Sequence, residues 1–159
     1  MKNLNNLPLR LGVGIILLND KNKILVGKRI DNHKNNRWQM PQGGIDKNEE
    51  FVHAAKRELE EETSVKSVKV IKQFDDWLTY ELPKHLLGKI WRGKYRGQKQ
   101  KWFIMKFLGK NNEININTKK PEFLDWKWIN TSELTDVAVS FKLKVYKEIE
   151  KKLVNLNLN

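Results

Sequence analysis

The fold is decided between residues 43 and 62, which read GGIDKNEEFVHAAKRELEEE. The apolar side chains in the second half of this stretch are three and four residues apart: Val52, Ala55 and Leu59. This spacing places apolar groups on one face of an amphipathic helix, and the acids near the start favour a helix N-terminus. The pattern predicts a helix over residues 49–63, capped by the side chain of Asn48 or Asp46.

Three glutamates of this predicted helix share one face. Glu58, Glu61 and Glu62 stand at positions i, i+3 and i+4, so their carboxylates lie within one helical turn. Like charges at this spacing repel each other and destabilise the helix when nothing neutralises them. A group of carboxylates without histidine or cysteine suits Mg²⁺ or Mn²⁺ better than zinc. For this fragment alone, the alternative is an acidic face that contacts only water.

The residues around these glutamates provide a second signal. Gly43, five residues, Glu49, seven residues, Arg57-Glu58-Leu59, one residue and then Glu61-Glu62 resemble the Nudix box, the signature of the Nudix hydrolases. The resemblance implies an α/β fold, namely an α/β/α sandwich with a mixed β-sheet and a catalytic loop–helix–loop. It also implies an enzyme that hydrolyses phosphoanhydride bonds with a divalent cation.

The resemblance implies roles for several of these residues. Glu58, Glu61 and Glu62 are expected to be catalytic and to bind the metal together with the main-chain carbonyl at Gly43. We expect Mg²⁺, for which Mn²⁺ can substitute. Glu122 matches a glutamate that relatives place over the metal, which makes it a candidate for a further ligand or the general base. An ordinary acid at the edge of a strand is the alternative for Glu122.

Two further expectations concern the support of this helix. Glu49 and Arg57 carry opposite charges and, by the resemblance, pair with each other rather than bind metal. Ser64 stands just past the helix end, where the family usually has glycine. That position favours left-handed backbone geometry, which costs a non-glycine residue about 1–2 kcal/mol. We therefore expect a modest loss of stability with intact chemistry.

The rest of the chain predicts a layered α/β domain. Apolar and aromatic runs predict strands at residues 11–18, 23–27, 65–74, 101–108 and 122–129, and a second helix at residues 140–153. The aperiodic, basic stretch 83–100 is expected to be a loop. Strands interleaved with helices indicate packed layers. We expect a single domain over residues 1–159, with frayed ends at about 1–7 and 155–159.

Charge and composition narrow the function classes. The net charge is +12, and residues 84–120 hold eleven lysines and arginines against one acid, Glu113. An acidic centre in a basic chain suits a bound cation beside a polyanionic ligand, and a lysine-rich surface kept for solubility is the alternative. The chain has no cysteine, which excludes disulfides and thiolate metal sites. Without a long apolar run or a signal-peptide pattern, we expect a cytoplasmic monomer with no membrane contact.

The resemblance covers the chain from about residue 8 to about residue 150. It is carried by LRLGVG (9–14), WQMPQGG (38–44), WLTY (77–80), GQKQKWF (97–103), PEF (121–123) and VSFK (139–142). These stretches resemble the branch that contains bacterial RNA 5′-pyrophosphohydrolases and asymmetric dinucleoside tetraphosphate hydrolases. Leu9 and Leu11 depart from that branch, which often has Tyr and Pro there, so the shape of the base pocket is open.

Within that branch, four residues match substrate-binding positions. Arg10 and Arg29 match residues that contact phosphates or stack on a base, Phe141 matches an aromatic that sandwiches a base, and Lys142 follows it. Arginine and an aromatic ring on either side of a base can hold any base. The alternatives are surface cations for the arginines and a core position for Phe141.

Three functions are therefore weighed. The leading hypothesis is hydrolysis of the 5′-triphosphate or diphosphate end of RNA to a 5′-monophosphate, which initiates mRNA decay. The second is asymmetric hydrolysis of diadenosine tetraphosphate to ATP and AMP at the same metal site. The third is a basic RNA-binding module with a vestigial acidic helix, against which the three glutamates argue. The basic stretch 84–120 suits RNA better than a dinucleotide. No sequence motif identifies a protein partner.

Overall fold

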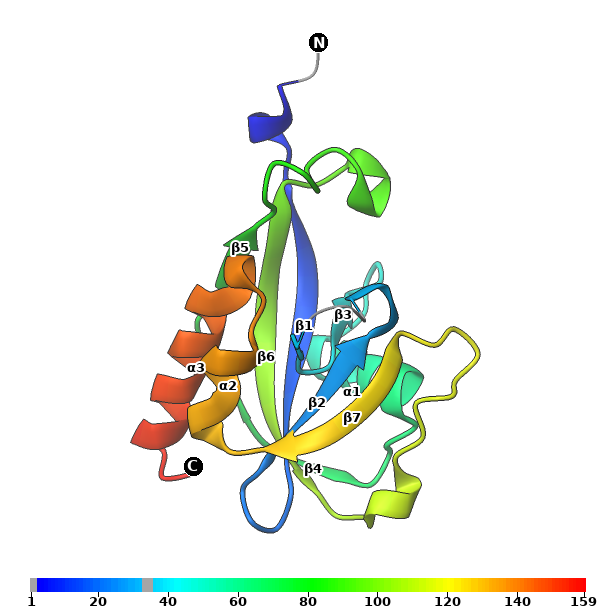
Figure 1. The fold of residues 1–159 in the computed structure, drawn as a ribbon, viewed down its shortest axis with the longest axis vertical. Helices are drawn as coiled ribbons and strands as arrows, with labels where there is room; N and C mark the ends of the chain where they lie inside the picture. The colour runs from blue at the N-terminus through cyan, green and yellow to red at the C-terminus, as the bar shows by residue number, and fades with distance from the viewer. Residues whose placement is uncertain (1–2, 33–35) are drawn as a thin grey trace.

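The computed structural model describes residues 3–32 and 36–159, in which helices cover both faces of a mixed sheet (Figure 1). Within these residues seven strands form the sheet, in the order β4-β6-β1-β2-β7, with β3 beside β1 and β5 beside β6. The strands are β1 (Leu9–Leu18), β2 (Ile24–Arg29), β3 (Gln42–Gly44), β4 (Val68–Gln73), β5 (Leu78–Glu81), β6 (Gly97–Phe107) and β7 (Phe123–Ile129). This architecture confirms the expected α/β class.

The parallel pair β1–β6 forms the centre of the sheet. Its register runs from Leu9 opposite Gly97 to Leu18 opposite Lys106. The other strand pairs of the described residues are antiparallel, so the sheet is mixed as expected. The predicted hairpin is also present, because Leu18 pairs with Ile24 at the start of β2.

Two apolar layers lie on the two faces of the sheet. One face is covered by α1 (Phe51–Thr63), and the other by α2 (Leu134–Val137) and α3 (Leu143–Asn155). Side chains alternate along a strand, so neighbours point to opposite layers. Trp102 packs in the α3 layer and Phe103 in the α1 layer, and both are fully buried.

Several predicted boundaries are wrong for identifiable reasons. Strand β6 starts at Gly97 rather than residue 101, because buried Gln98 and Gln100 hide its first residues from an apolar pattern. The second helix begins as a 3-10 turn, η6 (Ser140–Lys142), before α3. The remaining short 3-10 turns are η1 (Leu4–Asn6), η2 (Ile30–Asn32), η3 (Ile90–Gly93), η4 (Asn111–Glu113) and η5 (Thr131–Glu133).

The sequence predicted the C-terminal end of α1 correctly but not its N-terminal cap. Its N-cap residue is Glu50, which makes no side-chain capping bond, so the expected caps Asn48 and Asp46 are wrong. Ser64 has the expected left-handed conformation, with φ 67°. Its N–H donates to the Glu60 carbonyl and its Oγ to the Asn115 carbonyl, both at 2.8 Å.

Hydrogen bonds hold the described ends of the chain. The C-terminal residues after α3 turn back, since Leu158 N donates to the Leu153 carbonyl at 2.9 Å and its side chain packs against the α3 layer. Near the N-terminus, Arg96 Nη1 donates to the Leu7 carbonyl at 3.0 Å. Met1 and Lys2 of the expected frayed end lie outside the described residues. None of the described helices is long and apolar enough to cross a membrane.

Candidate active site

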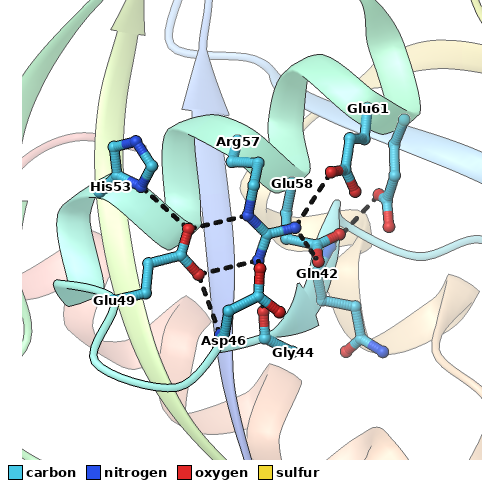
Figure 2. A network of polar contacts seen from close by, with 9 residues as sticks. Gln42, Gly44, Asp46, Glu49, His53, Arg57, Glu58 and Glu61 are labelled. Carbon is cyan, nitrogen blue, oxygen red and sulfur yellow. Dashed lines mark hydrogen bonds and ion pairs between the residues drawn. The ribbon is translucent and has the colours of Figure 1, made fainter.

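Arg57 joins the loop before α1 to the helix (Figure 2). Its Nε donates to Glu49 Oε2 at 2.8 Å, and its Nη2 donates to Glu49 Oε1 and the Gly44 carbonyl, both at 2.9 Å. The hydrogen bonds from Arg57 to Glu49 are the main reason that the pKa of Glu49 is lowered to about 2. The Asp46 N–H also donates to Glu49, at 3.0 Å. The predicted Glu49–Arg57 pair is confirmed, and it fixes the loop–helix–loop.

The same guanidinium contacts two of the predicted metal ligands. Arg57 Nη1 donates to Glu58 Oε1 at 3.0 Å and to Glu61 Oε1 at 3.1 Å (Figure 2). The Glu58 side chain is mostly buried, whereas the Glu61 side chain is 56% exposed. Both carboxylates therefore lie on the predicted face of α1, and Arg57 neutralises part of their charge. Glu60 is exposed, as expected for the acid outside the set.

Gly43 lies directly against Glu58. A Cβ atom added at Gly43 would meet the Glu58 carboxyl carbon at 1.9 Å, so a larger residue there would displace the Glu58 carboxyl group. Burial raises the pKa of Glu58 to about 7, despite the opposing effect of Arg57. A carboxylate held this close to a main-chain loop can bind the same metal ion as a carbonyl group of that loop.

Glu62 is the most buried of the three glutamates, with 2% of its surface exposed. Its Oε2 accepts from the Gln42 N–H at 3.3 Å, but its Oε1 has no hydrogen-bond partner. Burial raises the pKa of Glu62 well above its ordinary value, and Glu122 and Glu58 add to the rise. The Glu122 charge thus acts on Glu62, so the structure brings these two carboxyl groups into one neighbourhood. Sequence alone gave no distance between them.

This group of carboxyls fits a hard divalent cation. Repulsion among Glu58, Glu62 and Glu122 and the unpaired Glu62 oxygen are features that a bound cation relieves. Within residues 3–32 and 36–159, no three acidic or histidine side chains are already arranged around one point as an ion requires. Arg57 holds Glu58 and Glu61 in ion pairs through the Oε1 atom of each carboxylate.

A cleft of about 760 Å³ opens beside these carboxyls. The predicted site residues that line it are Arg10, Arg29, Gly43, Glu58, Glu61, Glu122, Phe141 and Lys142. Glu62 is not among the lining residues and is held next to Gln42 instead. Strands β1, β2 and β3, helix α1 and the turn η6 thus contribute to one site, although they are far apart in sequence.

The predicted substrate-binding residues have partners within the protein. Arg29 donates to both carboxylate oxygens of Asp31, at 2.9 and 2.8 Å. The ring of Phe141 lies 5.7 Å from that of Tyr80. Lys142 Nζ lies 5.3 Å from the centre of the Tyr80 ring and bonds to Gln39 Oε1 at 3.2 Å. Burial and Arg29 lower the pKa of Lys142 to about 7.

The comparison with known proteins now identifies the family. Residues 8–149 match the NUDIX domain. This chain belongs to the Nudix family. It is 64% identical to an RNA pyrophosphohydrolase of Pelagibacter ubique (strain HTCC1062) over 93% of each chain. It is 46% identical to the enzyme of that name from Orientia tsutsugamushi (strain Boryong), over 94% of this chain and 92% of that one.

Solved structures of low sequence identity share the fold of this Nudix hydrolase. The E. coli dihydroneopterin triphosphate pyrophosphohydrolase aligns with a TM-score of 0.70 at 18% identity, covering 91% of this chain and 99% of that one. A C. elegans Ap4A hydrolase aligns with a TM-score of 0.65 at 17% identity, covering 92% and 99%. Members of this family generally depend on a divalent metal, and the carboxyl group at Glu58 and Glu62 agrees with that requirement.

Several residues of the Nudix cleft were missed from the sequence. Tyr80, Gln39, Trp91 and His85 line it. Of the other two histidines, His53 bonds to Glu49 and His33 lies outside the described residues. No periodic pattern marks these positions, because they come from the β5–β6 loop (residues 82–96), from β5 and from the residues before β3.

The basic stretch 84–120 does not form one surface in this Nudix hydrolase. Lys101 donates to main-chain carbonyls, and Lys106 donates to the Asn19 carbonyl at 2.8 Å. The stretch follows β6 from one end of the sheet to the other (Figure 1). Four exposed cations belong to the β5–β6 loop, which also lines the cleft: Lys84, Lys89, Arg92 and Lys94. The exposed cations that lie beside the cleft are therefore those of this loop rather than those of the whole stretch.

Proposed function

We propose that this Nudix hydrolase is an RNA 5′-pyrophosphohydrolase that converts the 5′-triphosphate or diphosphate end of RNA to a 5′-monophosphate and so initiates mRNA decay. Relatives that are 64%, 46% and 42% identical over more than nine tenths of this chain carry the name RNA pyrophosphohydrolase. The two Ap4A hydrolase structures are only 17% identical, so they support the fold and not their substrate.

One observation carries the proposal. The carboxyls of Glu58, Glu61 and Glu122 border the same cleft as the cations Arg10 and Arg29. Carboxyls supply ligands for a metal, while cations neutralise phosphate oxygens that the metal does not reach. A phosphorylated chain end placed in this cleft therefore meets both kinds of group.

The proposed cofactor is Mg²⁺, for which Mn²⁺ can substitute. Glu58, Glu61 and Glu62 would hold it together with the Gly43 carbonyl, since all of these donors are hard oxygens. When bound, the ion neutralises phosphate charge and lowers the pKa of a water. Without it, the burial and the repulsion that raise the pKa of Glu58 and of Glu62 stay uncompensated.

The chain's own residues carry the rest of the reaction. A water attacks one phosphorus atom, the phosphoanhydride bond breaks, and pyrophosphate or phosphate leaves the RNA 5′-monophosphate. Glu122 is the proposed general base or additional ligand, because it lines the cleft together with Glu58 and Glu61 and its charge raises the pKa of Glu62. Arg10 and Arg29 are proposed to bind phosphate or a base, while Phe141 and Lys142 hold the first bases. We further propose that the enzyme is a cytoplasmic monomer.

The test is a comparison of two substrates. We expect kcat/KM, measured with Mg²⁺ at fixed salt, to be clearly higher for a short 5′-triphosphate RNA than for diadenosine tetraphosphate. Release of pyrophosphate or phosphate and appearance of the 5′-monophosphate end are followed directly. A clear preference for the dinucleotide would overturn the RNA assignment.

A second test separates an enzyme from an RNA-binding module. Glu61→Gln keeps the size of the side chain but removes a proposed ligand charge, so we expect turnover to be lost while RNA binding is retained. Glu60→Gln on the exposed side of α1 is the matched control and should keep full activity. Full turnover by Glu61→Gln would show that the metal assignment is wrong.

A further inference from the structure

Trp91 lines the cleft and has no role in the function proposed above. The guanidinium carbon of Arg10 lies 5.3 Å from the centre of its indole ring. The ring of Tyr95 meets it nearly edge-on, with centroids 6.3 Å apart and an angle of 75°. A cation on one face and an aromatic ring at the edge fix the orientation of an indole. Trp91 is thus a half-buried, oriented ring with access to the cleft.

The backbone at Trp91 is strained. Trp91 and Arg92 have φ of 51° and 57°, followed by Gly93 with φ 68°. A bulky residue rarely adopts this left-handed conformation, and such outliers gather at ligand sites. Gly93 permits the turn, since a Cβ there would lie 2.7 Å from the Gly88 carbonyl oxygen. The turn leaves Arg92 exposed while Trp91 borders the cleft.

The surroundings of Trp91 suit a single-stranded nucleic acid. Lys89, Arg92 and Lys94 are exposed and lie within three residues of it in the same loop. Stacking aromatic rings combined with cations that follow the backbone are the general means of holding unpaired nucleotides. A mononucleotide would need only one stacking surface, whereas several linked nucleotides can use more.

Trp91 and Phe141 have different contact partners within the cleft. Trp91 contacts Arg10, whose Nη2 would lie 2.3 Å from a Cβ added at Gly44, beside the metal loop. Phe141 instead packs on Tyr80, next to Lys142. The two rings come from the β5–β6 loop and from η6, with no ring contact between them among the described residues.

We propose that Trp91 is a base-stacking residue for single-stranded RNA and takes the base of a different nucleotide from the one held by Phe141. This assignment rests on the proposed RNA function and adds a second base subsite to it. Arg10, which backs the indole, links that subsite to the phosphate end of the cleft.

The test combines protein variants with abasic RNA. Short 5′-triphosphate RNAs that lack the base at the first, second or third nucleotide are compared with the complete RNA. Trp91→Ala is expected to raise KM about tenfold on the complete RNA with little change in kcat. Removal of the base at one position should raise the KM of the wild type by the same factor and should not raise the KM of Trp91→Ala further. Phe141→Ala should likewise be insensitive to loss of one base, but at another position.

Two controls distinguish stacking from a loss of structure. Trp91→Phe retains an aromatic face and should recover most of the affinity. Trp128→Phe changes a half-buried tryptophan of β7 that contacts Phe107 and Trp126 outside the cleft, and should behave as the wild type. The assignment is overturned if Trp91→Ala raises KM by the same factor whichever base is missing. It is also overturned if Trp91→Ala and Phe141→Ala become insensitive to loss of the same base. Failure of the wild type to hydrolyse the complete RNA instead overturns the proposed function itself.

Discussion

At the scale of single residues, the cleft is bordered by ionisable groups that burial pushes toward their neutral forms. The causes are the same for a carboxyl and for an amine, because a low-dielectric environment disfavours either charge. Burial raises the pKa of Glu58 to about 7 and lowers that of Lys142 to about 7. Both groups therefore cost stability in the charged state, and an anionic ligand or a cation can lower that cost.

Lys142→Met tests how much stability the protein loses by burying the charged amine of Lys142. The ordinary pKa of lysine, 10.5, falls to about 7 in the folded chain, so between these values the unfolded chain holds more protons and stability rises with pH. We expect the variant to be more stable at pH 7 by about 1 kcal/mol, after the loss of the Gln39 hydrogen bond. Its stability should also change less from pH 7 to pH 9. Urea denaturation at both pH values measures the difference.

The matched control is Lys151→Met, which changes an exposed lysine of α3. Its stability should follow that of the wild type at both pH values. An equal rise of stability with pH in Lys142→Met and the wild type would show that Lys142 is charged in the folded chain at pH 7. The substrate role proposed for Lys142 is checked on the same variant as a fall in kcat/KM on RNA.

At the scale of elements, α1 is held in position at both of its ends. Arg57 joins its middle to the loop through Glu49 and Gly44, and a left-handed residue ends it at Ser64. The N-terminal end lacks a side-chain cap, so the Glu49–Arg57 pair holds the entry to the helix instead. The element thus depends on one ion pair and one strained residue.

Ser64→Gly is expected to stabilise the protein without changing its activity. Glycine removes a left-handed strain of about 1–2 kcal/mol, while the hydrogen bond from Ser64 Oγ to the Asn115 carbonyl, worth about 0.5–1.5 kcal/mol, is lost. The net gain should be about 0.5 kcal/mol, seen as a higher urea midpoint with an unchanged slope. A lower midpoint would mean that the bond to Asn115 outweighs the strain.

At the scale of the whole molecule, the cations behind the net charge of +12 have different surroundings. Cations of β6 are used within the fold, as Lys106 shows through its bond to Asn19. The exposed cations of the β5–β6 loop remain available beside the cleft. RNA binding should therefore depend on this loop and on salt, rather than on the net charge as such.

A salt series tests this localisation. The logarithm of kcat/KM on 5′-triphosphate RNA should fall linearly with the logarithm of salt concentration. Replacing Lys89 and Lys94 together with alanine should make that slope shallower by about 1.4, or about 0.7 for each phosphate contact. Lys151→Ala on α3 is the control and should keep the wild-type slope. Equal slopes for all three proteins would place the RNA contact elsewhere.

The sequence by itself determined what depends on residues a few positions apart. Helix α1 and the common face of Glu58 and Glu61 follow from local spacing, while the Glu49–Arg57 pair and the left-handed Ser64 were implied by the resemblance to the family. The apolar runs of β1 and β2 were equally clear, since buried strands need such residues. Within the Nudix box, resemblance named the candidate ligands before any distance was known.

Only the tertiary structure decided which distant groups meet. Glu122 is held at the end of β2 because β7 pairs with β2 and Ile30 N donates to the Glu122 carbonyl, and from there its charge acts on Glu62 of α1. Buried Gln98 and the cleft residue Trp91 follow no periodic pattern, since their environment comes from other elements. Local spacing fixes the face of a helix, whereas burial, repulsion and a shared cleft arise only when the sheet brings separate segments together.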